Sequence, residues 1–143
     1  MFLGEYRHAL DPKGRVVLPA EFRAQLADGC VVTKGQERCL YVFPLGRWAE
    51  EVERLNRLPR TNSKVRAYTR SVFAGAKQET PDRQGRIMLP ERLRAYADLG
   101  REAVVVGVAD RIEIWNQESW EQLSSEADDY YADIEEEFGT EGI

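Results

Sequence analysis

The sequence predicts a mixed α+β, β-rich fold built from two tandem copies of one small module. Three observations predict it. A 14-residue segment occurs twice in the chain, short runs rich in Val and Ile are bounded by Gly and Pro, and helical spacing of apolar residues is confined to short stretches between these runs. At 143 residues the chain is long enough for one ordinary domain or for two packed half-size modules.

The repeat is the strongest of these observations. DPKGRVVLPAEFRA at residues 11–24 returns as DRQGRIMLPERLRA at residues 82–95, an offset of 71. The match extends upstream, and downstream it continues after a slip of one residue, through these pairs: Phe2 with Phe73, Gly4 with Gly75, Gly35 with Gly107, Leu40 with Ile112, Val42 with Ile114, and Trp48 with Trp120. Such agreement at fixed spacing indicates an internal duplication.

Each copy begins with a predicted strand, at 2–10 and at 73–80, followed by an Asp-x-x-Gly turn. Asp can bond its own backbone two residues on, and Gly accepts positive φ, so this pattern favours a tight turn. Short strands follow at 15–18 and 86–89, and Pro19 and Pro90 end them at a position that suits the first turn of a helix.

The remaining elements of each copy are a helix and two strands. Helices are predicted at about 20–26 and 91–97, where Phe22 with Leu26 and Leu93 with Ala97 have i, i+4 spacing. Core strands at 30–33 and 103–108 are followed by partner strands at 40–43 and 112–115.

Helices are predicted to end both copies. Trp48, Val52 and Leu55 have helical spacing, Pro59 stops that helix, and a linker helix follows at about 62–72. After Trp120 a helical period of apolar residues continues to Phe138, with carboxylates opposite, before a frayed tail at 139–143. We therefore predict four segments: module 1 at 1–57, a linker helix at 58–72, module 2 at 73–118, and an acidic helix and tail at 119–143.

Charge is distributed unevenly along the chain. The net charge is −5, yet residues 118–143 hold ten carboxylates and no Lys or Arg, so residues 1–117 carry 20 basic and 15 acidic side chains. A basic body with an acidic tail suggests a polyanionic partner. An ordinary Arg-rich surface explains the charge equally well.

Several classes of function are disfavoured. The two cysteines, Cys30 and Cys39, lack the spacing of a zinc site and are expected to pack in the core, and His8 is expected to be a sheet residue. We find no nucleotide-binding or hydrolase motif, so we expect no enzyme, no catalytic residue, no metal and no cofactor. No signal peptide or membrane span is expected either, which favours a cytoplasmic protein.

The paired D-x-x-G-R-[VI]-x-L-P segments, the opening F-x-G and the linker pattern R-x-x-x-R-x-V-F-A-G-A, which begins at Arg66, resemble the MraZ family. The resemblance covers all but about the last ten residues. It implies two SpoVT/AbrB-type modules that pair within one chain into a swapped-hairpin, barrel-like unit. It further implies a ring-shaped homo-oligomer, associated with the nucleoid, that regulates transcription by binding short G-rich direct repeats in double-stranded DNA. Those repeats lie upstream of the division and cell wall gene cluster that includes its own gene.

The candidate DNA-binding residues belong to the two turns. We expect Arg15 and Arg86 to contact base edges or phosphates, since the Arg fork matches guanine O6 and N7. Lys13 and Arg83 are expected to bind phosphates. Four further residues are expected to shape the loops and orient the arginines: Asp11, Asp82, Gly14 and Gly85. Weaker candidates are Arg7, Arg23 and the cationic side of the linker helix, with Lys64, Arg66 and Arg70.

Two alternatives stay open at this point. Each Asp–Arg pair could be a local salt bridge that only braces a turn. The chain could also be an antitoxin-like or structural module of AbrB fold that binds protein. The acidic C-terminal helix is expected to point away from DNA, and either docks on a neighbouring subunit or keeps the particle soluble.

Overall fold

The computed structural model describes residues 1–133. Its elements in chain order are β1 (Phe2–Ala9), β2 (Arg15–Val17), α1 (Ala20–Arg23), η1 (Ala24–Leu26), β3 (Cys30–Lys34), η2 (Gln36–Arg38), β4 (Leu40–Pro44), α2 (Leu45–Asn56), α3 (Ser63–Gly75), β5 (Lys77–Glu79), β6 (Arg86–Met88), α4 (Glu91–Tyr96), β7 (Glu102–Ala109), β8 (Arg111–Asn116) and α5 (Gln117–Ala132). Both predicted copies therefore show the predicted order of strand, turn, strand, helix, strand and strand.

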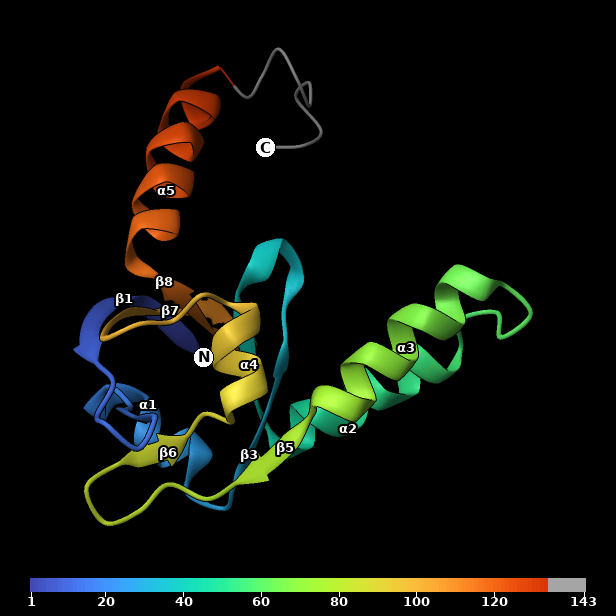
Figure 1. Cartoon of the computed structure of the whole chain (residues 1–143), viewed down its shortest axis with the longest axis horizontal. Helices are drawn as coiled ribbons and strands as arrows, with labels where there is room; N and C mark the ends of the chain where they lie inside the picture. The colour runs from blue at the N-terminus through green and yellow to red at the C-terminus, as the bar shows by residue number, and fades with distance from the viewer. Residues whose placement is uncertain (134–143) are drawn as a thin grey trace.

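The two copies are interleaved. An antiparallel sheet has the strand order β1-β7-β8-β4-β3-β5, and β2 pairs with β6 in a separate two-stranded ribbon. The first strand of each copy pairs with a strand of the other copy, because β1 lies beside β7 and β5 lies beside β3. The predicted swapped, barrel-like unit of mixed α+β class is confirmed, and Figure 1 shows how its strands are arranged. The four segment boundaries remain a prediction.

The strand register shows that the duplication is a two-fold pseudosymmetry in space. In the ribbon, Val16 faces Ile87, its own repeat equivalent at offset 71. In the sheet, Tyr41 faces Glu113, which is its equivalent at offset 72. A residue faces its equivalent only on a two-fold axis, so the axis passes through both pairs and relates the two turns.

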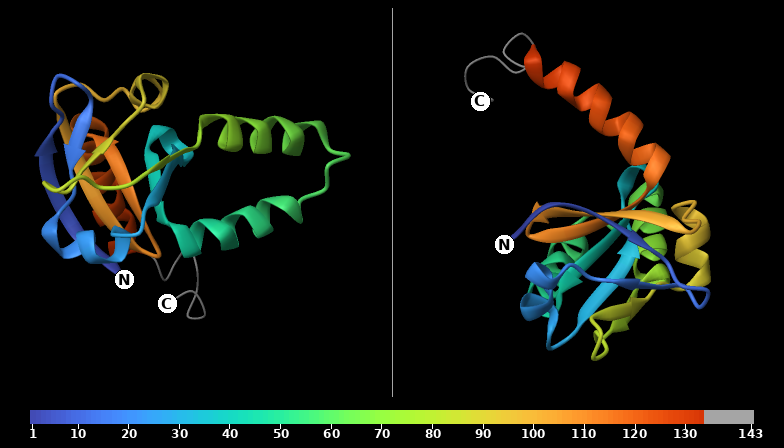
Figure 2. Two further views of the ribbon diagram at one scale, coloured as in Figure 1. Left: turned by 90° about the horizontal axis from the view of Figure 1, so that it is seen from below. Right: turned by 90° about the vertical axis from the view of Figure 1, so that its left-hand side faces the viewer.

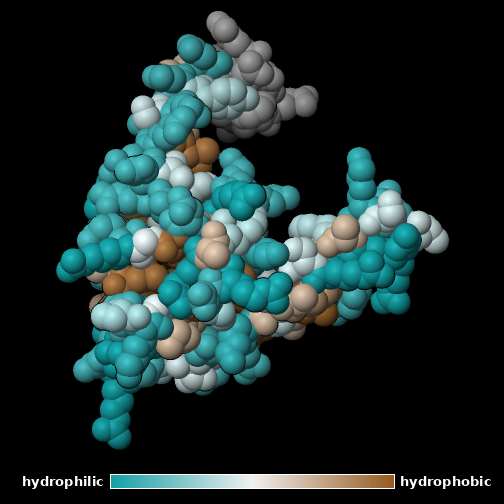
Figure 3. Space-filling view, viewed as in Figure 1, coloured by the Kyte–Doolittle hydropathy of each residue, from teal (hydrophilic) through white to brown (hydrophobic). Residues whose placement is uncertain are grey.

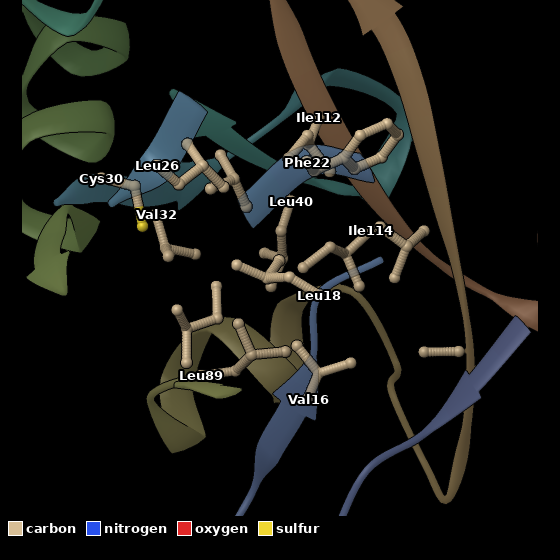
Figure 4. Close-up of a cluster of buried hydrophobic side chains, with 14 of the residues drawn as sticks. Val16, Leu18, Phe22, Leu26, Cys30, Val32, Leu40, Leu89, Ile112 and Ile114 are labelled. Atoms are coloured by element: carbon tan, nitrogen blue, oxygen red, sulfur yellow. The ribbon is translucent and has the colours of Figure 1, made fainter. Parts of the chain in front are cut away.

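The core lies between the ribbon and the sheet. Val16 of the ribbon, Leu89 just after β6, and the sheet residues Val32, Leu40 and Ile114 are fully buried, and Figure 4 shows their side chains converging. Burying one such side chain stabilises the fold by about 1.5–3 kcal/mol. Because successive side chains of a strand point to opposite faces, the burial of one face of the ribbon also determines which residues lie on its outward face.

Two arms extend from the barrel. The helical hairpin of α2 and α3 forms one arm, and α5 forms the other (Figure 2). Asn62 caps α3 by accepting hydrogen bonds from the amides of Lys64 (2.8 Å) and Val65 (3.3 Å), and Asn116 caps α5 through the amide of Ser119 (2.9 Å). Within residues 1–133 each helix is too short or too polar to span a bilayer.

One predicted element is wrong. The strand expected at 73–80 forms only as β5, Lys77–Glu79, because α3 continues to Gly75. Phe73 lies on that helix against Trp48 of α2, with ring centroids 6.0 Å apart, whereas its repeat equivalent Phe2 is buried in the core. Packing against α2 extends the helix into the residues that would otherwise lengthen the strand.

The C-terminal helix is confirmed as far as Ala132, but none of its residues is buried. Trp120 and Leu123 pack against the sheet, whereas Tyr130 and Tyr131 are exposed. The predicted continuation through Phe138 and the tail at 139–143 lie outside the described residues.

Candidate nucleic-acid interface

The two Asp-x-x-Gly-Arg turns have the same hydrogen bonds. In the first turn, Oδ1 of Asp11 accepts from the amides of Lys13 (3.0 Å) and Arg15 (2.9 Å), and the Gly14 amide donates to the Asp11 carbonyl (2.9 Å). Gly14 has φ +82°, in the region that favours glycine. The aspartate therefore closes the turn, as the sequence pattern predicts.

The second turn repeats this geometry. Oδ1 of Asp82 accepts from the amides of Gln84 and Arg86 at 2.9 Å each, and the Gly85 amide donates to the Asp82 carbonyl at 2.9 Å. Gly85 has φ +75°. Two different loop sequences thus adopt one conformation because they share Asp, Gly and Arg.

Each aspartate also holds its arginine. The second carboxylate oxygen accepts from Nε of the arginine, at 2.6 Å between Arg15 and Asp11 and at 2.8 Å between Arg86 and Asp82. Hydrogen bonds from the arginine amide, followed by its guanidinium, lower the pKa of both aspartates below the ordinary value. Both carboxylates are therefore ionised at neutral pH.

The outer part of each guanidinium stays available. The side chains of Arg15 and Arg86 are 28% and 26% exposed, so neither is buried. Each aspartate accepts from Nε of its arginine. The Nη nitrogens of both arginines make no hydrogen bond within residues 1–133. The salt bridge thus orients the arginine while leaving both Nη nitrogens, with their four N–H groups, on its outer edge.

The ribbon places both arginines on one face. Arg15 lies opposite Met88, and Arg86 lies opposite Val17. These four residues are half-buried and alternate with Val16 and Ile87, which are buried, so the four share the outward face. Arg15 and Arg86 are diagonal neighbours in this antiparallel pair, and such neighbours lie roughly 7–8 Å apart, so both arginines leave the surface close together.

Each turn is supported by an arginine of the other copy. Arg94 donates from Nε to the Leu89 carbonyl (2.8 Å), and its guanidinium lies so close to Gly14 that a Cβ there would be 2.6 Å from Cζ. The Leu89 amide donates to the Gly14 carbonyl at 2.9 Å. Glycine at this position is therefore required both by its φ and by the arginine beside it.

The pseudosymmetry repeats this support at the second turn. Arg23 donates to the Leu18 carbonyl (3.0 Å) and lies against Gly85, where a Cβ would be 2.6 Å from its Cζ. Sequence reasoning named Arg23 only as a weak candidate and missed Arg94. The offset of 71 that relates these two arginines is the signal that could have found both.

The other candidates are divided between this surface and distant ones. Lys13 and Arg83 are exposed within the turns. Arg7 lies on β1, within 3.8 Å of Glu5 and 3.7 Å of Glu121. The cationic side chains of α3 belong to the hairpin arm, which extends away from the barrel (Figure 2). The structure thus brings together the turn residues and does not bring the α3 residues to them.

The residues with reactive side chains occupy structural positions. His8 lies in β1 opposite Ala103, and burial, with a smaller effect of Arg23, lowers its pKa. Cys30 and Cys39 are buried free thiols, and burial raises the pKa of Cys30 to about 12 and also raises the pKa of Cys39. Both cysteines pack in the interior, as predicted.

Comparison with known proteins agrees with the duplicated turns. The sequence model of one family, the MraZ protein, described as antitoxin-like, matches the chain twice, at residues 1–71 and 72–139. The chain belongs to the MraZ family. Its two matched segments each contain one complete Asp-x-x-Gly-Arg turn.

Several curated MraZ proteins resemble the chain over nearly its whole length. The transcriptional regulator MraZ of Salinispora tropica is 51% identical over 136 residues, covering 95% of this chain and 96% of that protein. The Moorella thermoacetica protein of the same name is 48% identical, with 95% of each chain covered. That of Clostridium acetobutylicum is 44% identical over 143 residues, covering 100% of both chains.

Proposed function

We propose that this chain is a sequence-specific, DNA-binding transcriptional regulator that reads DNA with Arg15 and Arg86. The single observation that carries the proposal is the outward face of the β2–β6 ribbon, where two oriented guanidinium groups present free Nη donors. Its relatives are named transcriptional regulators, which supports the same function. We further propose a cytoplasmic, nucleoid-associated protein that acts by binding and not by catalysis.

The turn geometry suits recognition of guanine. An Arg fork that donates to O6 and N7 in the major groove is worth about 1–3 kcal/mol of discrimination against other bases. The aspartates prevent free rotation of the fork, so less conformational entropy is lost when the arginine meets a base edge. We propose that Lys13 and Arg83, which are exposed at the turn tips, bind flanking phosphates, a contact that fixes register without reading sequence.

One barrel offers few cationic contacts, so a single chain should bind DNA weakly and with strong salt dependence. We propose that a homo-oligomer, in the form of a ring, presents several ribbon faces to one duplex. The second contact is then intramolecular and benefits from a high effective concentration. Evenly spaced ribbons would require evenly spaced direct repeats. On the family resemblance, these repeats lie upstream of the division and cell wall gene cluster that includes the chain's own gene.

Footprinting on the DNA upstream of the chain's own gene tests this proposal. We expect protection of regularly spaced short repeats, lost in Arg15→Ala and Arg86→Ala while the fold is unchanged. Arg92→Ala is the matched control, because Arg92 is exposed on α4 beside Ala74 and Gly75 and lies outside both turns. Protection by both ribbon variants equal to that by the parent would refute the assignment.

The family description favours one second candidate, an antitoxin-like module that binds a protein. The two functions differ in their partner, which is a protein for the antitoxin-like module and DNA for the regulator. Affinity purification that yields a stoichiometric protein, together with no preference for repeat-bearing DNA, would support that function over DNA recognition.

A further inference from the structure

A small hollow in the surface is lined, among the described residues, by three cations and no carboxylate. It has a volume of about 170 Å³ and lies beside residues 74–76, where α3 leads into β5. Its charged lining consists of Lys34, Lys77 and Arg92. None of these three side chains forms an ion pair within residues 1–133. Because cations that gather without counterions attract negative charge, the hollow is a candidate site for an anion.

Three different elements bring these cations together. Lys34 ends β3, Lys77 begins β5 and Arg92 lies in α4. Lys77 pairs with Val32 across the two strands, which makes it a diagonal neighbour of Lys34 at roughly 7–8 Å. Like charges this close repel each other, and a bound anion would remove that cost. Since Lys34 belongs to the first copy and Arg92 to the second, the anion would also contact both copies.

Lys34 also lines a larger cleft between the hairpin arm and the sheet, so the cleft and the small hollow adjoin. The cleft has a volume of about 510 Å³, within the range of about 300–1,000 Å³ that is usual for small-molecule sites. Nζ of Lys34 donates to Oγ of Ser71 (3.0 Å) and lies 5.4 Å from the ring centroid of Tyr96. The ammonium is therefore held between the two hollows, and two of its three N–H groups make no hydrogen bond to the described residues.

The other charges of the cleft are already paired. Glu51 is only 7% exposed and accepts hydrogen bonds from Arg47 (3.0 Å) and Arg54 (2.7 Å). Arg111 donates to Glu113 at 2.8 Å. Because these cations have carboxylate partners, the negative group of a ligand would favour the small hollow, and the cleft would hold the uncharged part of the ligand.

Tyr68 gives the cleft an aromatic surface for that uncharged part. Four aromatic rings line the cleft: Tyr41, Phe43, Tyr68 and Tyr96. All except Tyr68 lie beneath a cation, at 4.8 to 5.4 Å between the cation and the ring centroid. The Tyr68 side chain is 37% exposed, and its hydroxyl accepts from Arg54 at 3.3 Å. A planar ring of a ligand can therefore stack on Tyr68.

Tyr68 and the small hollow lie along one side of α3. Tyr68, Ser71 and Gly75 occur at i, i+3 and i+7, and each of them lines the cleft or the small hollow. At a rise of about 1.5 Å per residue, Tyr68 and Gly75 are about 10 Å apart along the helix. A small molecule with a planar ring at one end and phosphate at the other can span this distance. Figure 3 shows that the surface of the hairpin arm is mainly hydrophilic, which suits a polar ligand of this kind.

We propose that the cleft and the small hollow together bind a nucleoside phosphate, with its phosphates at Lys34, Lys77 and Arg92 and its base against Tyr68. Phosphate oxygens accept charge-assisted hydrogen bonds from Lys and Arg, and a base has the flat π-face that stacks on an aromatic ring. These four residues lie outside both Asp-x-x-Gly-Arg turns, so the inference goes beyond DNA recognition and does not rest on it. It gives the chain a small-molecule site between the hairpin arm and the barrel.

Isothermal titration calorimetry of the full chain with ATP and with inorganic pyrophosphate tests this site. The parent should bind ATP more tightly than pyrophosphate, because only ATP carries a ring for Tyr68. Lys77→Ala/Arg92→Ala should weaken the binding of both probes by about tenfold or more, since each cation supplies a charge-assisted hydrogen bond. Tyr68→Ala should weaken the binding of ATP alone and bring it to the level of pyrophosphate. All three substituted positions are exposed, and circular dichroism verifies that each variant is folded.

Arg60→Ala/Arg70→Ala is the matched control, because it removes the same charge from exposed positions that line neither the cleft nor the small hollow. It should leave both affinities unchanged. A parent that does not bind ATP, or a control that loses as much affinity as Lys77→Ala/Arg92→Ala, would overturn the inference. Displacement of ATP by a scrambled DNA duplex would assign the three cations to the DNA backbone and would overturn it as well. Footprinting with Arg15→Ala and Arg86→Ala decides the proposed function independently.

Discussion

Replacing either turn glycine with alanine should destabilise the fold by about 2–3 kcal/mol. Gly14 and Gly85 have φ of +82° and +75°, which costs a residue with Cβ about 1–2 kcal/mol. The new Cβ would also meet the guanidinium of Arg94 or Arg23 at 2.6 Å from Cζ, so that side chain must move. The hydrogen bond it loses is worth about 1 kcal/mol.

Urea unfolding followed by tryptophan fluorescence measures this loss. Gly46→Ala is the matched control, because Gly46 lies within α2 with nothing within 4 Å of an added Cβ. That change should be neutral or should stabilise the helix by roughly 0.5–1 kcal/mol. The contrast between the variants isolates the turn geometry from glycine replacement in general.

A double-mutant cycle tests the cause of the effect. Arg23→Ala removes the side chain that the Cβ at Gly85 would meet, so the double variant should lose less stability than the sum of the two single variants, by about 1 kcal/mol. Additive losses would show that Arg23 does not support the second turn. A Gly85→Ala variant as stable as Gly46→Ala would refute the turn geometry itself.

Three further predictions concern the carboxylates and the thiols. Asp11→Asn and Asp82→Asn keep an oxygen that accepts from the turn amides, but they turn an amide donor toward Nε of the arginine. Specific DNA binding should therefore weaken while thermal unfolding stays cooperative. Unchanged affinity in a gel shift would contradict this. The folded pKa of both aspartates lies below the ordinary 3.8, so their contribution to folding stability is present above pH 3.8 and is lost as the pH falls through the folded pKa. Denaturant midpoints measured between pH 6 and pH 2 should show this loss in the parent. The chain with both Asp→Asn substitutions should show less of it. Cys30 and Cys39 should resist a thiol reagent until the protein unfolds, and rapid labelling of the native protein would contradict their burial.

Most of the fold could be predicted from local patterns because the duplication supplies each pattern twice. Val and Ile runs, the Asp-x-x-Gly turns and the prolines at 19 and 90 determine elements within a few residues of themselves. The exception is 73–75, where contact with Trp48 extends α3, since packing across two helices is not visible in a local window.

The turn geometry of the candidate site was predictable from the sequence, but the arrangement of the two turns was not. The turn motif identified Arg15 and Arg86, whereas the pairing of β2 with β6 that brings them to one face depends on contacts between segments about 71 residues apart. The offset of 71 relates Arg94 to Arg23, but the support that each arginine gives to a turn is a tertiary contact between the copies. A tertiary contact between copies leaves no signal in the spacing of either copy alone.

DNA recognition by Arg15 and Arg86 is tested most directly by fluorescence anisotropy with a repeat-bearing duplex and a scrambled duplex at several salt concentrations. We expect the parent to prefer the repeats, and each Arg→Ala variant to lose about 1–3 kcal/mol of that preference, or roughly 5- to 150-fold in the affinity ratio. Arg92→Ala should keep it. A double Arg15→Ala/Arg86→Ala variant that retains the parent's ratio would contradict the proposed role of the ribbon face.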